Sequence, residues 1–246
     1  MAIPEAVQLL DRELREIFGQ RLQSLILYGA LEGQPATDDG HSPAHGPAES
    51  PSRTMAVVDA MTREDLRACA TRVDAWHGRG LATPLLVAAR EFDRSLDVFP
   101  LEFGAILASH VVVSGENPFA ASKVEPADVR RACEVQARSH LLHLRESYLE
   151  TRGRADALSD LIVQSAPAFA ALLTSVARLE GDGGRDAGTA ARHAERILGV
   201  GGGAIAEIVK LVGVHELPSA DAERLFAPYL DAVEHLVNYV DGWSAR

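Results

Sequence analysis

The chain has 246 residues, of which 47% are hydrophobic and 24% charged, so it should bury one large core or two modest ones. The 24 lysines and arginines stand against 35 acidic residues, and the net charge of −11 disfavours a dedicated nucleic-acid-binding protein. The N-terminus lacks the pattern of a secretory signal and no apolar run reaches about 18 residues, so we expect no membrane span and a cytoplasmic location.

The first half of the chain alternates helices with short apolar runs. Apolar residues at three- and four-residue steps predict a helix over 4–18. Short apolar runs predict strands over 22–28, 54–58, 84–88 and 101–107, with helices over 62–77 and 90–96. This alternation predicts a mixed α/β domain over residues 1–118.

Residues 32–53 interrupt that pattern. The segment contains four prolines and three glycines but no aromatic residue, Val, Ile or Leu. Because it has nothing to bury, we expect a mobile loop.

The second half has helical periodicity throughout. The predicted helices cover residues 129–148, 155–179, 190–198, 204–212 and 220–240. The change in character falls near residues 117–126, so we expect an all-α bundle over 119–246. The fold class is therefore α+β, with an α/β domain followed by a helical domain.

The order of residues around the first two strands matches a known layout. Leu25-Ile26-Leu27-Tyr28 is followed by Gly29-Ala30, a loop, Ser52 and a second apolar run. This layout resembles the DNA polymerase beta-like nucleotidyltransferase superfamily. In its members a Gly-Ser turn after the first strand holds nucleotide phosphates, and the next strand begins Ser-Asp-x-Asp, whose carboxylates bind magnesium.

Later segments extend the resemblance over most of the chain. Residues 94–103, residues 114–119 and the helix around 131–134 resemble a bacterial subgroup that joins a nucleotidyltransferase-like domain to a C-terminal helical domain. This architecture is similar to that of aminoglycoside nucleotidyltransferases. It implies a nucleoside triphosphate and Mg²⁺ as cofactors, if the protein is active.

Three positions depart from the superfamily pattern in ways that affect its chemistry. Ser52 matches the motif serine, but the two aspartate positions carry Arg53 and Met55, and neither side chain binds magnesium. The turn serine is replaced by Ala30. The resemblance implies that Gly29, Ala30 and Ser52, which occupy the turn and the motif serine position, are the candidate nucleotide-binding residues.

One carboxylate matches the third acid of the family. Glu102, on the strand expected over 101–107, resembles the residue that binds metal or acts as general base in related enzymes. Its other interpretation is the solvent-facing member of an alternating strand. Asp59, after the second strand, and Asp38 and Asp39 in the loop are further candidates for metal binding.

These features lead to three hypotheses. The first is a degenerate, non-catalytic nucleotidyltransferase-like protein that keeps a scaffold for binding a nucleotide or a partner. The second is an active Mg²⁺-dependent enzyme that transfers a nucleotide to a small hydroxylated acceptor, with Glu102 as base or metal ligand. The third is a structural protein that forms a homodimer through its helical half, whose apolar residues include Phe169, Leu172, Leu173, Val176 and Leu179.

Other motifs favour structural roles. His140 and His143 lie three apart on a helix without a third ligand nearby, which favours packed or half-exposed histidines over a metal site. The run Gly199–Gly203 follows a helix and lacks a Lys-Ser/Thr pair, which favours a break between helices over a phosphate loop. Cys69 and Cys133 show no metal-ligand spacing, so we expect two buried thiols.

Overall fold

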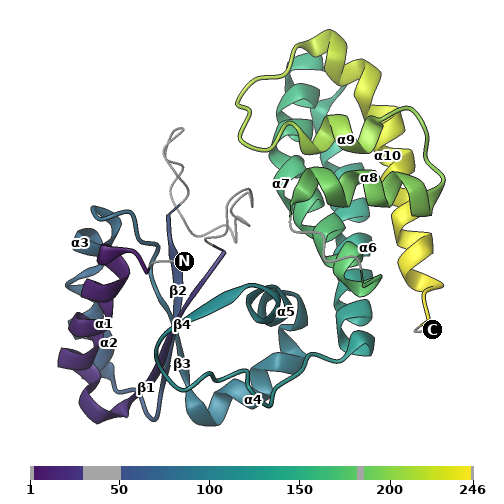
Figure 1. Ribbon diagram of the computed structural model, residues 1–246. Coiled ribbons are helices and arrows are strands. Elements are labelled where there is room, and N and C mark those ends of the chain that lie inside the picture. The colour runs from purple at the N-terminus through teal and green to yellow at the C-terminus, as the bar shows by residue number, and fades with distance from the viewer. Residues whose placement is uncertain (1–2, 30–50, 182–185, 245–246) are drawn as a thin grey trace. The chain divides into compact units, whose positions relative to one another are not determined.

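The computed structural model describes residues 3–29, 51–181 and 186–244. Internal contacts divide the described chain into two compact units, one ending at Glu125 and the other beginning at Pro126. The first contains a small four-stranded sheet with helices, and the second is helical (Figure 1). At this level the predicted mixture of an α/β part and a C-terminal helical part is confirmed.

The N-terminal unit contains five α-helices and four strands among the described residues. Its helices are α1 (Glu5–Phe18), α2 (Arg63–Ala70), α3 (Val73–His77), α4 (Ala89–Val98) and α5 (Pro100–Ala108), with the short 3-10 helix η1 (Gly19–Arg21). Its strands are β1 (Leu22–Tyr28), β2 (Arg53–Val58), β3 (Leu85–Ala88) and β4 (His110–Gly115).

The strands lie in the order β3-β2-β1-β4. β1 is antiparallel to both neighbours, with Tyr28 opposite Arg53 on one side and His110 on the other. β2 and β3 run parallel and are joined through α2 and α3. The end of β1 therefore lies beside the starts of β2 and β4.

Helices cover both faces of this sheet (Figure 1). On one face, residues of α1, α2 and α3 pack against Leu25, Leu27, Ala56 and Val58. On the other, Phe92 of α4 and Phe103 of α5 pack against Ile26, Met55 and Val57. Because successive side chains of a strand point to opposite faces, β1 and β2 are apolar on both sides. Phe119, which the expected boundary assigns to the helical domain, packs in this second core.

The strand predicted over residues 101–107 is wrong. These residues form α5, and the fourth strand lies at His110–Gly115 instead. Pro100 is the first residue of α5, a position that proline favours because the first turn of a helix needs no backbone N–H partner. The single helix predicted over 62–77 is also divided, into α2 and α3.

The C-terminal unit consists of five helices among its described residues. They are α6 (Pro126–Thr151), α7 (Ala155–Leu179), α8 (Ala187–Leu198), α9 (Ala204–Val209) and α10 (Ser219–Asp241). The glycine run at 199–203 lies between α8 and α9, and Gly199 ends α8 in the left-handed conformation, as expected for a break between helices.

α7 supplies much of the core of the helical unit. Phe169, Leu172, Leu173 and Val176 are buried against its neighbours, so this face is core and gives no support to a dimerisation module. α7 is also the one described helix that is long and apolar enough to span a membrane, with a mean hydropathy of 1.4. Half of that apolar window is buried inside the protein, as is common for a core helix.

Candidate functional site

The expected phosphate-binding turn lies where β1 ends and β2 begins. Because Tyr28 is opposite Arg53, Gly29 and Ser52 are neighbours just beyond that pair. Gly29 has a φ of 65°, and a Cβ added to it would lie 3.9 Å from Cδ of Arg53. The turn is therefore left-handed at Gly29 and has the Arg53 side chain beside it.

Ser52 is held in place by its backbone. Its N–H donates to Gly80 O and its carbonyl accepts from Ala82 N, both at 2.9 Å, and it forms a parallel bridge with Leu81. This isolated bridge joins Ser52 to the segment that precedes β3. The structure thus brings Gly29 and Ser52 together, whereas Ala30, Asp38 and Asp39 lie outside the described residues.

The two positions that carry aspartates in the resembled family lie on one face of β2. Arg53 is partly buried, and Met55 is completely buried among the aromatic side chains beneath α4 and α5. On β3, Leu85 is opposite Met55 and Val87 is opposite Val57. This pair of adjacent strands therefore carries no carboxylate side chain.

Glu102 lies in the first turn of α5, not on a strand beside β2. Its side chain is exposed. The expected strand over residues 101–107 is therefore wrong as the element that positions Glu102. Strand geometry supports neither a role for Glu102 as metal ligand or base nor its interpretation as the solvent-facing residue of an alternating strand.

Asp59 is at the other end of β2 from Ser52. Its N–H donates to Arg21 O at 2.8 Å, next to the pair Leu22–Val58. Asp59 lies seven positions after Ser52 along extended chain, a distance of about 23 Å. Asp59 is therefore too remote to share a ligand with the Gly29–Ser52 edge.

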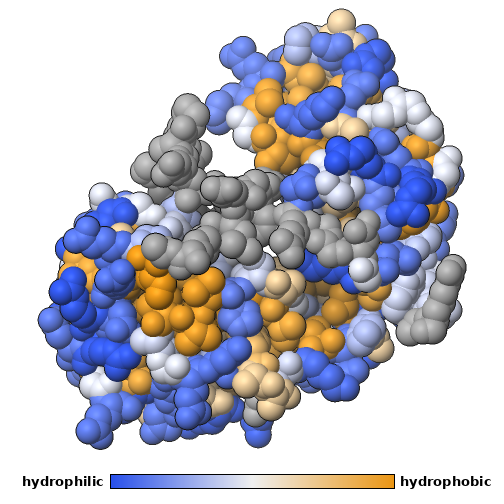
Figure 2. All heavy atoms as spheres, in the orientation of Figure 1, coloured by the Kyte–Doolittle hydropathy of each residue, from blue (hydrophilic) through white to orange (hydrophobic). Residues whose placement is uncertain are grey.

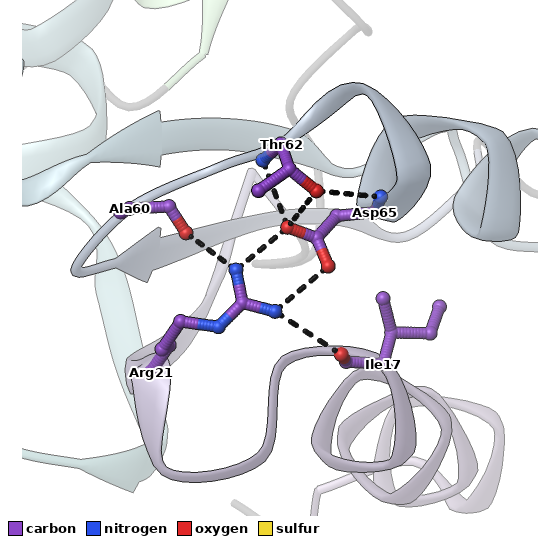
Figure 3. A network of polar contacts seen from close by, with 5 residues as sticks. All are labelled: Ile17, Arg21, Ala60, Thr62 and Asp65. Carbon is purple, nitrogen blue, oxygen red and sulfur yellow. Dashed lines mark hydrogen bonds and ion pairs between the residues drawn. The ribbon is translucent and has the colours of Figure 1, made fainter.

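Asp65, near the same end of β2 as Asp59, forms an ion pair with Arg21 (Figure 3). The Arg21 guanidinium donates to both of its oxygens, at 2.6 and 2.7 Å, and also to the carbonyl of Ala60. Thr62 caps α2 and donates its N–H and hydroxyl to Asp65. These hydrogen bonds, led by Arg21, hold the pKa of Asp65 well below its usual range.

His110 is a polar residue at the candidate edge that sequence reasoning missed. It begins β4 opposite Tyr28, and its Nδ1 lies 3.1 Å from Ile106 O while Nε2 lies 3.3 Å from Asn117 Oδ1. The signal was its place directly before the β-branched run Val111–Val113, which was not recognised as a strand.

The edge is therefore formed by Gly29, Tyr28, Ser52, Arg53 and His110. Across the described ranges, no group of three His, Cys, Asp or Glu side chains could hold a metal ion. Mg²⁺ requires oxygen ligands, and Arg53 and Met55 supply none, so these residues do not fit the ion that the family uses. Comparison of the chain with protein-family models and with curated proteins finds no match.

The histidine pair lies elsewhere, in the helical unit. His140 is packed against Phe169 and its Nε2 lies 2.7 Å from Tyr229 Oη, whereas His143 is exposed beside Glu146. The preference for ordinary packed or half-exposed histidines over a metal site agrees with this arrangement.

Proposed function

We propose that the N-terminal unit is a degenerate nucleotidyltransferase-like scaffold that binds a nucleotide or a partner without transferring nucleotides. Three features support the likeness: β1 ends at a left-handed Gly29, β2 returns antiparallel from Ser52, and β3 follows parallel to β2. The shared feature is the layout of elements around one edge of a sheet.

The proposed loss of catalysis rests on Arg53 and Met55, which stand at the positions of the metal-binding aspartates. Nucleotidyl transfer develops negative charge between the attacking hydroxyl and the leaving pyrophosphate, and two metal ions normally stabilise it. A guanidinium and a buried thioether cannot hold those ions. Leu85 and Val87 on the neighbouring strand offer no replacement.

Binding without metal has a physical basis at the same edge. Arg53 places a permanent positive charge beside the Gly29 turn, and arginine pairs well with phosphate oxygens. A cation in place of a metal-binding carboxylate favours a bound anion without Mg²⁺. We therefore favour a nucleoside triphosphate, bound through its phosphates, as the ligand.

The test is thermal unfolding of the full chain with each of the four ribonucleoside triphosphates, with and without Mg²⁺. A ligand that binds only the folded state at a hundredfold excess over its Kd stabilises it by about 2.7 kcal/mol. We expect a shift for at least one triphosphate that persists without Mg²⁺. Mg²⁺-dependent transfer of a nucleotide to a hydroxylated acceptor, lost in Glu102→Gln, would instead establish the active enzyme.

The matched variants are Arg53→Gln and Arg90→Gln. Both remove one arginine, but Arg90 is exposed in the first turn of α4, beyond the opposite end of β3. The ligand-induced shift should disappear in Arg53→Gln and persist in Arg90→Gln. If both variants keep the shift, the nucleotide does not bind at this edge.

A further inference from the structure

A shallow apolar groove lies between two helices of the C-terminal unit. We name it the α6–α10 groove, and it has a volume of about 400 Å³. It is lined by Arg145, Tyr148 and Leu149 of α6 and by Phe226, Ala227 and Leu230 of α10. Tyr148 and Phe226 stack with their ring centroids 4.3 Å apart and their planes 12° apart, and we call this stacked pair the aromatic floor of the groove.

The α6 side of the groove continues into exposed apolar residues. Leu149 is 75% exposed and Leu142, seven residues earlier, is 62% exposed. Two helical turns separate them, so they lie on one line about 10 Å apart on the outer surface of α6. Figure 2 draws one face of the molecule, on which hydrophobic areas lie among hydrophilic ones without marking the groove. A helix packed alongside α6 would cover both leucines with its own side chains at the same spacing.

The charges near the groove are mostly negative. Within one turn of its lining residues, three arginines already form ion pairs: Arg145 with Glu234, Arg152 with Glu150, and Arg224 with Glu207. Glu223 and Asp231, spaced eight residues apart on α10 with Ala227 midway between them, form no ion pair with any described residue. They therefore make an acidic row along the α10 side of the groove.

We infer that the α6–α10 groove docks an amphipathic helix of a partner protein, with apolar side chains on Leu142, Leu149 and the aromatic floor and basic side chains facing Glu223 and Asp231. In the helix-in-groove mode an amphipathic helix lays its apolar face into a hydrophobic groove. The acidic row selects the sign of the partner's charge.

The same charge argues against two other occupants. A second copy of this chain has a net charge of −11 and would bring another Glu223–Asp231 row to the contact. An anionic lipid surface would be repelled by the row in the same way. A basic amphipathic helix can cover the exposed leucines on the α6 side and face Glu223 and Asp231 on the α10 side.

The test uses the full chain and two synthetic helical peptides of about 14 residues, long enough for roughly four turns. Both carry leucines at the same helical spacing, but one has lysines and the other glutamates beside them. We expect fluorescence anisotropy to show binding of the lysine peptide at low salt and at least about tenfold weaker binding of the glutamate peptide.

Two variants place that binding on the groove. Leu149→Ser removes an exposed anchor without touching the core and should weaken the lysine peptide about tenfold. Reversing the row with Glu223→Lys and Asp231→Lys should exchange the preference, so that the glutamate peptide binds more tightly. The charge-matched control, Glu64→Lys with Asp74→Lys, alters exposed acids of the N-terminal unit and should leave binding unchanged.

The inference is overturned if the wild type binds the two peptides equally, or if charge reversal leaves their order unchanged. It is also overturned if light scattering shows a dimer that Leu149→Ser dissolves, because the occupant is then a second copy. Binding to phosphatidylcholine vesicles that is lost in Leu149→Ser would assign the groove to lipid instead.

Discussion

Arg21, directly before β1, forms an ion pair with Asp65 in the first turn of α2, 44 residues later in the sequence. Asp65 is almost fully buried and accepts hydrogen bonds from Arg21 and Thr62. Removing one partner of a buried ion pair leaves the other charge buried without a counter-charge, which lowers the stability. The intact pair itself adds little stability compared with apolar side chains packed in its place.

We expect Asp65→Ala to lower the free energy of unfolding by about 2–3 kcal/mol at pH 7, a figure reduced because Arg21 is partly exposed. The folded pKa of Asp65 is depressed, so its stabilisation is fully present above the ordinary value of 3.8 and is lost as the pH falls further. Urea unfolding at pH 7 and pH 3 should show the difference from wild type shrinking with acid. Asp74→Ala, at an exposed carboxylate, should show neither effect; an equal loss there would contradict the assignment.

His140 begins a chain of hydrogen bonds inside the helical unit. Tyr229 donates to Ser165 at 3.1 Å and Ser165 donates to Ile162 O at 3.0 Å, so Nε2–H of His140 donates to Tyr229. Burial, with a smaller contribution from His143, lowers the pKa of His140 to about 4. The neutral imidazole is therefore the form that fits this core.

This depressed pKa predicts a loss of stability in mild acid. The unfolded chain binds a proton near pH 6.5 while folded His140 does not, so stability falls as the pH drops from about 6.5 towards 4, by at most about 3 kcal/mol. His140→Gln keeps a donor for Tyr229 and should remove this slope from urea unfolding curves. His143→Gln should retain it, because His143 is exposed; identical slopes in the two variants would refute the role of His140.

At the scale of elements, β4 depends on a close approach of two backbones. Gly115 has a φ of 77°, and a Cβ there would lie 1.9 Å from Gln23 O on β1. No L side chain fits without moving the strands apart. Gly104, in contrast, lies inside α5 with open space around it.

Two glycine-to-alanine changes should therefore have opposite effects. Gly115→Ala should lower the free energy of unfolding by on the order of 3 kcal/mol, because the strand pair must separate. Gly104→Ala should raise it by about 1 kcal/mol, because alanine favours a helix interior. Urea unfolding measures both, and a neutral Gly115→Ala would show that β1 and β4 are not paired as described.

The sequence predicts some of these elements better than others for physical reasons. Residues 22–28 and 54–58 are short apolar runs ending at turns, and both are strands as predicted, with β2 one residue longer. Residues 101–107 are apolar at nearly every position, so their periodicity does not separate a buried helix from a strand. Pro100 was the better signal, since it favours the first turn of a helix.

The candidate site was less accessible to sequence reasoning than the fold. Gly29 and Ser52 could be paired because they flank consecutive strands. Glu102 was misplaced because its position followed from the wrong element. Asp59 follows the second strand as expected, but the length of β2 separates it from the Gly29–Ser52 edge. His110 was missed because strand pairing alone brings it beside Tyr28.

At the scale of the whole molecule, each unit has a core of its own. The sheet of the N-terminal unit is packed between two helical layers, and the helices of the C-terminal unit pack around α7. A ligand that binds at the Gly29–Ser52 edge should therefore stabilise the first unit directly. A peptide in the α6–α10 groove should stabilise the second.

The distribution of cysteine makes this division measurable. The chain has two cysteines, Cys69 packed in the core beneath α1 in the first unit and Cys133 completely buried on α6 in the second. Burial raises the pKa of both thiols, that of Cys133 to about 12, so neither should react with a thiol reagent while its unit is closed. Each sulfur thus records the opening of the unit that contains it.

We expect a triphosphate to slow the labelling of Cys69 in moderate urea and to leave that of Cys133 unchanged, as followed by mass spectrometry of the two cysteine peptides. The groove-binding lysine peptide should do the reverse. Equal protection of both thiols by either ligand would mean that the units open together. The natural placement of one thiol in each core therefore lets the wild-type chain, without any substitution, report separately on two binding events.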